Sequence, residues 1–255
     1  MVDVDTGKVT KLEALVRWQH PEKGMIPPGA FLSVAAESGL IVDVGEHVLR
    51  EACRQAKVWS AAIGRPVSVA VNVAERQLID GHLVETVRRV LAETELDPHQ
   101  LELEISEELI VERLDGHLHL LHELVDMGVR MALDDFGTSR ASLSSLKRLD
   151  MVKTLKIDRA FVIDVATDPV DRKIITAIVA LAHSVGMEVV AEGVEDADQA
   201  TVLMELGVSK IQGFYFARPD SSHKVVTALT KRYDLPWDPP KAEISDGAPI
   251  DVSEV

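Results

Sequence analysis

The sequence predicts an α/β protein in which parallel strands close into a barrel. Its 255 residues can bury one large core, and barrels of strands and helices often reach this length as a single domain. Of the chain, 46% is hydrophobic but only 4% is aromatic, so aliphatic residues dominate. Short apolar segments also alternate with amphipathic segments of helix length. This order implies parallel strands joined by right-handed crossovers.

Seven segments have the composition and alternation of short strands. They are residues 11–18, 67–73, 101–106, 130–135, 154–158, 188–193 and 210–216. Five segments between them have apolar residues at helical spacing, and several end in the glycine expected just past a helix C-terminus. They are residues 44–64, 83–95, 114–128, 171–186 and 197–207.

Each strand segment has one aliphatic face and one face that ends in a polar residue, because residues two apart share a face. In a closed barrel the aliphatic face packs against the outer helices, and active sites collect where the strands end. We therefore expect seven polar side chains to meet at one mouth. They are Glu13, Asn72, Glu104, Asp134, Lys156, Glu192 and Gln212. Any one of them alone would be an ordinary solvated residue, but the same parity on seven strands makes that interpretation weak.

Several carboxylates at one mouth predict a metal site, because they repel one another by several kcal/mol unless cations neutralise them. The available ligands are oxygens, including the Asn72 carbonyl, and none of the residues at these strand ends is a cysteine that could supply a thiolate. Hard divalent ions such as Mg²⁺ or Mn²⁺ prefer such ligands.

The adjacent acids Asp134 and Asp135 indicate two metal ions rather than one. By parity Asp135 points away from the mouth, unless the chain curls there, and the small residues of "FGTS" allow a curl. Two adjacent carboxylates could then reach two neighbouring ions, with one carboxylate bridging both ions. Paired metals are used to hydrolyse phosphate esters.

Other charged residues near the strand ends suit this chemistry. Arg17 can hold a phosphate, and Lys156 can orient a water molecule or stabilise developing charge. Glu192 could be a metal ligand, a general base or both, with Glu195 as a supporting group on the following loop.

The net charge narrows the possible partners and location. A formal charge of −15 argues against binding to DNA or RNA duplexes or to an anionic membrane surface, because both need a basic protein surface. The single cysteine, Cys53, cannot form an internal disulfide and fits a reducing compartment, so we expect a cytoplasmic protein. The most apolar helical segment is interrupted by His183 and Ser184 before it reaches membrane-spanning length.

Seven motifs together resemble the EAL domain family of bacterial cyclic di-GMP phosphodiesterases. They appear in order between about residue 3 and about residue 230, as "EALVRWQHP", "VNVAERQL", "ELEISEE", "DDFGTS", "LKIDRAFV", "AEGVED" and "QGFYFARP". The resemblance implies a modified TIM-like β/α barrel that hydrolyses cyclic di-GMP to linear pGpG with two Mg²⁺ or Mn²⁺ ions.

The resemblance also assigns roles to residues. Metal ligands would be Glu13, Asn72, Glu104, Asp134, Asp135 and Glu192. Lys156 would position the attacking water and Glu192 would act as its base. Substrate contacts would come from Leu15, Arg17, Glu195, Gln212 and Phe214. Glu107 would steady the loop that follows the double aspartate, which the family uses in dimerisation, so a homodimer is expected.

The motifs define a domain over residues 1–233, followed by an acidic, proline-containing tail at 234–255 that we expect to be disordered. The resemblance implies that the family's first strand would precede Met1, so we expect either a cropped barrel or one open at an edge, with sensory or GGDEF domains upstream in a longer protein. The alternative function is a weak or inactive EAL domain that senses cyclic di-GMP or contacts proteins. A metal-dependent aldolase or isomerase also fits the fold, but not the motifs.

Overall fold

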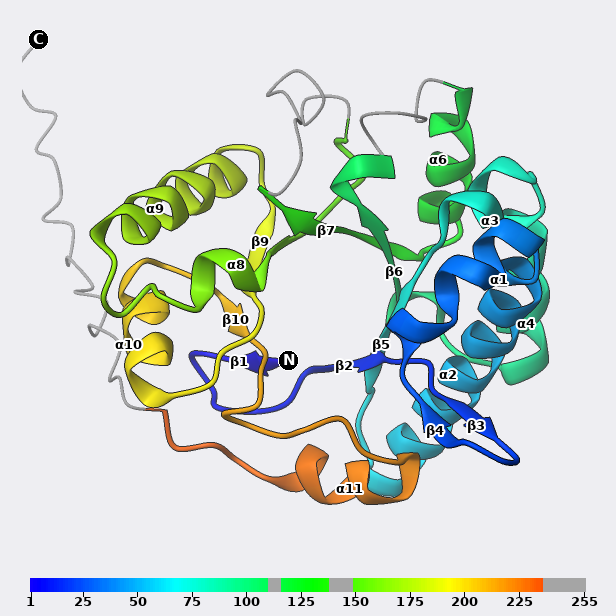
Figure 1. Ribbon diagram of the computed structural model, residues 1–255, viewed down its shortest axis with the longest axis horizontal. Helices are drawn as coiled ribbons and strands as arrows, with labels where there is room; N and C mark the ends of the chain where they lie inside the picture. The colour runs from blue at the N-terminus through cyan, green and yellow to red at the C-terminus, as the bar shows by residue number, and fades with distance from the viewer. Residues whose placement is uncertain (110–115, 138–148, 236–255) are drawn as a thin grey trace, which may run out of the picture.

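The computed structural model describes residues 1–109, 116–137 and 149–235. Within these ranges, eight strands form one sheet in the order β1-β10-β9-β8-β7-β6-β5-β2. Figure 1 shows the sheet curved into a ring with the main helices around its outside. The predicted α/β barrel is confirmed.

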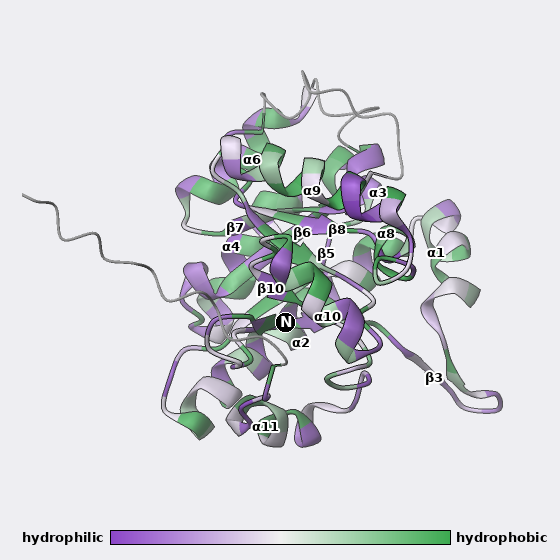
Figure 2. Ribbon diagram, turned by 90° about the vertical axis from the view of Figure 1, so that its left-hand side faces the viewer, coloured by the Kyte–Doolittle hydropathy of each residue, from purple (hydrophilic) through white to green (hydrophobic). Residues whose placement is uncertain are grey.

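The seven strands from β2 to β10 form six neighbouring pairs, and all six pairs are parallel, as the alternation of strands and helices predicted. The strands of the sheet are β1 (Val2–Asp3), β2 (Lys11–Ala14), β5 (Ser68–Asn72), β6 (Leu101–Ser106), β7 (Arg130–Phe136), β8 (Thr154–Ile157), β9 (Glu188–Ala191) and β10 (Lys210–Ile211). Their aliphatic face is buried in the main core, as Val69 and Val71 on β5 illustrate. Figure 2 shows these strands inside the layer of helices.

The connecting helices cover the outside of the ring. They are α1 (Leu32–Ser38), α2 (Ile41–Ile63), α3 (Glu75–Ile79), α4 (Leu83–Thr94), α6 (Leu118–Asp126), α8 (Arg159–Val162), α9 (Pro169–Ser184), α10 (Ala197–Glu205) and α11 (Ser222–Thr230), with short 3-10 turns η1 (Pro28–Ala30) and η2 (Pro98–Gln100). Aspartate side chains cap the N-termini of α8, α9 and α10 by accepting backbone N–H bonds. In the described part of the chain, no helix combines the length and apolarity needed to cross a membrane.

The expected opening between the first and last strands is bridged by β1, a strand outside the seven predicted segments. Residues Val2 and Asp3 of β1 pair antiparallel with Ile211 and Lys210 of β10. On its other side, Val2 forms an antiparallel bridge with Val9, just before β2. A two-residue strand carries too little alternation to be seen in a sequence, although Val2 is buried in the core.

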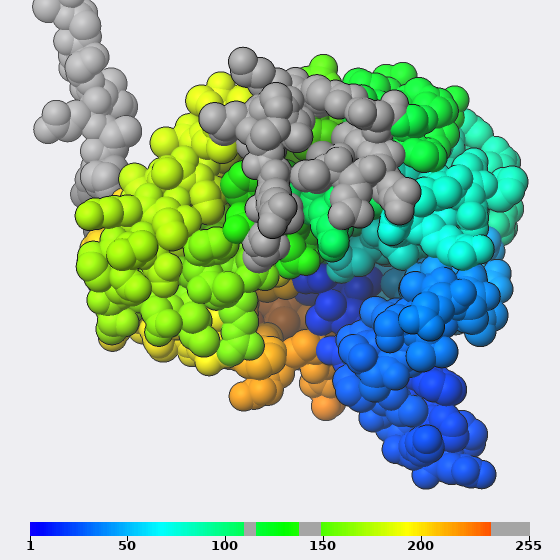
Figure 3. Space-filling model, turned by 45° about the horizontal axis from the view of Figure 1, so that its top comes forward, coloured from blue at the N-terminus to red at the C-terminus, as the bar shows by residue number. Residues whose placement is uncertain are grey.

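Two predicted strands are much shorter than expected, whereas the bounds of the other five agree with the prediction within two residues. The segment 11–18 divides into β2, which ends at Ala14, and β3 (Trp18–His20), which pairs with β4 (Gly24–Ile26) in a separate hairpin. Figures 2 and 3 show this hairpin projecting from the barrel. The segment 210–216 is extended only at Lys210–Ile211, because the chain then turns back so that the N–H of Tyr215 bonds the carbonyl of Val194.

Part of the predicted tail, residues 236–255, lies outside the described residues. The same holds for residues 138–148, which follow the double aspartate, and for residues 110–115. The first two residues of the predicted helix 114–128 fall in that last range, and α6 occupies most of the rest.

Candidate active site

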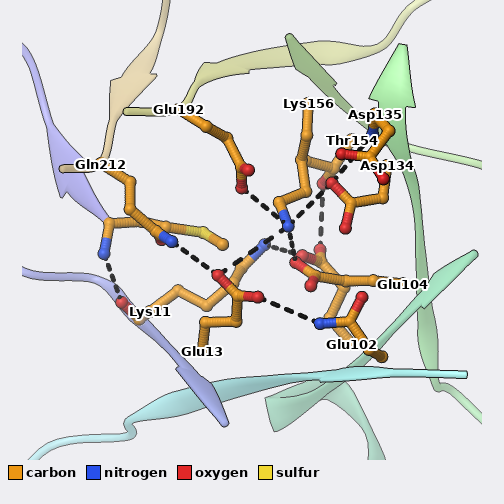
Figure 4. Close-up of polar contacts among 12 residues, drawn as sticks. Lys11, Glu13, Glu102, Glu104, Asp134, Asp135, Thr154, Lys156, Glu192 and Gln212 are labelled. Carbon is orange, nitrogen blue, oxygen red and sulfur yellow. Dashed lines mark hydrogen bonds and ion pairs between the residues drawn. The ribbon is translucent and has the colours of Figure 1, made fainter. Parts of the chain in front are cut away.

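The carboxylates that parity placed at one mouth gather around the ammonium group of Lys156 (Figure 4). Its Nζ atom lies 2.8 Å from Glu104 Oε1, 2.8 Å from Glu192 Oε1 and 3.0 Å from Asp134 Oδ1, and 4.0 Å from Glu13 Oε2. The contacts to Glu104 and Glu192 lack hydrogen-bond geometry, so they are ion pairs held by charge. Lys156 is fully buried, which strengthens these interactions because water does not screen them.

Amide side chains fix Glu13 from two sides. Asn72 Nδ2 donates to Glu13 Oε1 at 3.0 Å, and Gln212 Nε2 donates to Glu13 Oε2 at 2.6 Å. Asn72 stands at the end of β5, while Gln212 directly follows β10. All seven residues predicted at the mouth are therefore brought together, from seven different strands or their ends.

Burial and mutual repulsion perturb the acids of this cluster. Burial raises the pKa of Glu104 well above its usual value, although Lys156 opposes the change. Burial, with a smaller contribution from Asp134, raises the pKa of Glu192 to about 7. Burial alone would lower the pKa of Lys156, but the surrounding carboxylates raise it well above its usual value. Lys156 therefore remains a cation at neutral pH, while Glu192 can exchange a proton there.

The double aspartate lies in a bulge of β7. Leu133 pairs with Leu155 of β8, whereas Phe136 pairs with Ile157, so β7 contains an extra residue at this point. Asp135 has a φ of 55°, in the left-handed region that side chains rarely adopt. The curl that we expected from "FGTS" thus occurs at Asp135 itself.

This bulge keeps Asp135 beside Asp134, as Figure 4 shows. Burial first, then the charges of Asp134 and Asp158, raise the pKa of Asp135 to about 6. A strained conformation that crowds like charges destabilises the protein, so it indicates a function for the pair.

Four of the predicted substrate residues follow the ends of strands that form the mouth, and we call these four the rim. Leu15, Arg17, Glu195 and Phe214 are exposed. Among the described residues the Arg17 guanidinium has no ion-pair partner, and Nη1 donates to the carbonyl of Val16 at 2.8 Å. Figure 3 shows a hollow on this side of the molecule, bordered by N-terminal residues in blue and by the orange segment that follows β10.

Two rim residues already have partners. Glu195 Oε1 accepts from Arg159 Nη2 at 2.7 Å. The guanidinium of Arg218 lies 4.5 Å from the centre of the Phe214 ring, a cation–π contact. Glu195 must therefore rearrange or share its partner if it contacts a ligand.

Glu107, expected to steady the loop after the double aspartate, is buried directly after β6 and contacts the start of that loop. Its Oε2 accepts from the backbone N–H of Gly137 at 2.8 Å. The loop residues themselves, 138–148, are outside the described part of the chain.

The residues at the mouth fit divalent cations in charge and donor type. Four acids, Glu13, Glu104, Asp134 and Glu192, surround the ammonium group of Lys156, and Asp135 lies beside Asp134, so four negative charges remain when all five acids are ionised. Buried Glu104 Oε2 has no hydrogen-bond partner, and such an orphaned carboxylate oxygen suits a metal ligand. As the described side chains stand, no three acidic, histidine or cysteine donors surround a common point, and Lys156 Nζ lies between the acids instead. Metal binding therefore requires small side-chain movements.

A family model for the EAL domain matches residues 1–219. The chain belongs to the EAL domain family. The match covers every residue that forms the mouth, from Glu13 to Gln212. The resemblance seen in the seven motifs is thus confirmed.

Named relatives of this EAL domain come from several bacteria. It is 41% identical over 223 residues to the bifunctional diguanylate cyclase/cyclic di-GMP phosphodiesterase MucR of Pseudomonas aeruginosa. It is 40% identical over 213 residues to the cyclic di-GMP phosphodiesterase PdeR of Escherichia coli. These matches cover 88% and 84% of this chain but 32% of each relative, so the chain spans about a third of their length.

A solved structure supports the same assignment. The PaMucR phosphodiesterase in complex with c-di-GMP superimposes on this EAL domain with a TM-score of 0.80 at 43% identity. The superposition covers 84% of this chain and 86% of that one.

Sequence reasoning missed several charged residues that border the site. Lys11 and Glu102 form a buried ion pair below it, and Asp158 lies beside Asp135. Lys11 and Glu102 stand two residues before predicted site residues on their strands, so the same parity rule would have placed them inside the barrel. The contacts of Arg159 and Arg218 at the rim carry no comparable signal in the sequence.

Proposed function

We propose that this EAL domain is a phosphodiesterase that hydrolyses cyclic di-GMP to linear pGpG with two divalent cations, Mg²⁺ or Mn²⁺. The observation that carries the proposal is the gathering of five carboxylates and Lys156 at one mouth, with every expected ligand present. The names of MucR and PdeR, and the cyclic di-GMP complex of PaMucR, indicate the substrate.

The cations would be held by Glu13, Asn72, Glu104 and Asp134 on one side and by Asp134, Asp135 and Glu192 on the other. When bound, they would supply charge neutralisation at the phosphate and acidify a water molecule. Arg17 would hold a phosphate at the rim, and Phe214 would present its ring to a guanine base, with Leu15, Glu195 and Gln212 as further contacts.

In the reaction, a water oxygen attacks phosphorus while the bond from phosphorus to one 3′-oxygen breaks. Lys156 orients the water, because its ammonium group can donate hydrogen bonds but cannot accept a proton at neutral pH. Glu192 accepts the proton of the water, which suits a carboxylate whose pKa is raised to about 7. The 3′-oxygen finally takes up a proton, which leaves pGpG with a free 3′-hydroxyl and a 5′-phosphate.

The test is to incubate the purified chain with cyclic di-GMP and Mn²⁺ and to follow pGpG by chromatography. We expect turnover that falls at least about a hundredfold in Glu192→Gln. The matched control is Glu188→Gln, on the same strand but exposed at its other end, which should keep activity within twofold. Binding of cyclic di-GMP without turnover would overturn the proposal in favour of a sensor or interaction module.

The resemblance to the family carries further predictions. They are a homodimer, an upstream sensory or GGDEF domain, a cytoplasmic location, and an EAL domain bounded by residues 1–233. The name of MucR, which includes a diguanylate cyclase activity, supports the second of these.

A further inference from the structure

A buried ion pair lies inside the barrel directly below the carboxylate cluster (Figure 4). Lys11 and Glu102 are only 4% and 1% exposed, and the ammonium group of Lys11 donates to Glu102 Oε1. The hydroxyl of Thr154, which is also buried, donates to Glu102 Oε2 at 3.0 Å. Both oxygens of the buried carboxylate therefore have a partner.

The three residues form a layer of the barrel interior. Lys11, Glu102 and Thr154 each stand two residues before a site residue, on β2, β6 and β8. The site residues are, in the same order, Glu13, Glu104 and Lys156. Residues two apart on a strand share a face, so this layer lies immediately beneath the mouth.

These strands are not neighbours in the sheet. In the strand order, β5 separates β2 from β6, and β7 separates β6 from β8. Backbone hydrogen bonds therefore do not join the three strands directly. The contacts of Lys11, Glu102 and Thr154 link them across the interior, and a barrel layer is built from alternate strands in this way.

Stability alone gives a poor reason for this arrangement. Branched aliphatic residues usually fill the interior of such barrels, and replacing a buried ion pair by apolar residues is often neutral or stabilising. An acidic site directly above gives a better reason. Lys11 interacts electrostatically with Glu104 as well as with Glu102. If Glu102 were neutral, the charge of Lys11 would oppose any cation that Glu104 helps to bind.

We propose that Lys11, Glu102 and Thr154 are positioning residues for the metal-binding carboxylates Glu13 and Glu104, and that Glu102 neutralises Lys11 beneath them. The inference rests on the proposed function, since it assumes that these carboxylates bind divalent cations. It assigns the three residues a role without contact to the metal or the substrate.

The test measures Mn²⁺ affinity directly, from the electron paramagnetic resonance signal of free Mn²⁺, in the full chain without substrate. Glu102→Gln leaves the Lys11 charge unbalanced beneath Glu104, so it should weaken Mn²⁺ binding about tenfold, the lower end of the effect of changes behind metal ligands. Lys11→Met removes one link of the layer but leaves no unbalanced cation, so it should weaken Mn²⁺ binding less than Glu102→Gln does. The double variant Lys11→Met/Glu102→Gln should recover most of the loss, because no unbalanced cation remains.

The control is Lys210→Met, which removes a lysine from β10 whose partner, Glu188, is exposed. It should leave Mn²⁺ affinity within twofold. Thermal melting shows whether each variant folds. If Glu102→Gln does not fold, Thr154→Val removes one hydrogen bond from the Glu102 carboxylate and should still weaken Mn²⁺ binding several-fold.

Distinct results separate this inference from the proposed function. If the parent chain binds Mn²⁺ and makes pGpG but Glu102→Gln, or Thr154→Val in its place, binds Mn²⁺ equally well, the positioning role is refuted and the function stands. A double variant no better than Glu102→Gln also refutes the charge argument. If the parent binds Mn²⁺ without making pGpG, the function fails while the affinities still decide the inference. A parent chain that binds no Mn²⁺ at millimolar concentration refutes both.

Discussion

Replacement of Lys156 by methionine removes the ammonium group at the centre of the carboxylate cluster while keeping a side chain of similar length. An ion pair at 2.8 Å has a Coulomb energy of about 6 kcal/mol at an effective dielectric constant of about 20. Desolvation offsets much of this, and removal of one partner from a buried pair typically costs about 3–5 kcal/mol. Protonation of the acids will keep the loss near the lower end, because the pKa of Glu192 is already raised to about 7.

In a chain of this size, 1 kcal/mol corresponds to roughly 2–4 °C in Tm. We therefore expect Lys156→Met to lower the Tm by roughly 10 °C at pH 8 in EDTA, measured by calorimetry or circular dichroism. Saturating Mn²⁺ should reduce the difference from the parent by at least half, because bound cations neutralise the same acids. Formation of pGpG should remain at least about a hundredfold lower in Mn²⁺, because the variant lacks the cation that we propose orients the water.

The matched control is Lys153→Met, three residues earlier, where the lysine is exposed and its Nζ donates to a backbone carbonyl. Its Tm and activity should equal those of the parent. The reasoning is wrong if Lys156→Met melts within about 2 °C of the parent in EDTA, or if Mn²⁺ increases the difference between them. It is also wrong if the variant makes pGpG at the parental rate.

Three more predictions follow from the same geometry. Because burial raises the folded-state pKa of Glu192 from 4.5 to about 7, its contribution to stability in EDTA is present below pH 4.5 and is lost as the pH rises to 7. Urea unfolding from pH 4.5 to 8 should therefore show a steeper loss of stability in the parent than in Glu192→Gln, which keeps only the slope from the other raised acids, Glu104 and Asp135. Gly213→Ala would place a methyl group 2.0 Å from the carbonyl oxygen of Val194 and should cost about 2–3 kcal/mol in urea unfolding, whereas Gly29→Ala meets nothing within 4 Å and should cost little. Asn72→Ala removes a predicted metal ligand at an exposed strand end, so turnover should fall about 10- to 100-fold with an unchanged Tm, and equal turnover would contradict the ligand assignment.

Parity along the strands was sufficient to predict four of the five acids that share the mouth, all except Asp135. Glu104 and Asp134 stand on β6 and β7 at positions that any parallel barrel would bring together, and Lys156 follows the same rule on β8. This works because the period of two is a property of every extended strand and does not depend on distant contacts. It could not predict that Lys156 would lie between the acids, since that depends on side-chain conformations.

Features that depend on pairing between distant segments were not predictable. β1 is two residues long, and its place is decided by its partners Ile211 and Lys210 near the other end of the domain. The link between Lys11 and Glu102 depends on the register of two strands that are not adjacent in the sheet. The bulge at Asp135 was expected as a possible curl, but its position depends on the pairing with β8.

The structure narrows the roles that the sequence left open for Lys156 and Glu192. Lys156 could have been a base only if burial had dominated and lowered its pKa, but four carboxylates raise the pKa instead, so the side chain can only donate. Glu192 is held by the same ammonium group, yet its pKa of about 7 keeps part of it protonated at neutral pH. In the proposed reaction, the acid that exchanges its proton near neutral pH would be the base, and the cation beside it that keeps its proton would orient the water. Glu192 is therefore the better candidate for the base, and its role as a metal ligand is compatible with that only if one oxygen remains free to accept the proton.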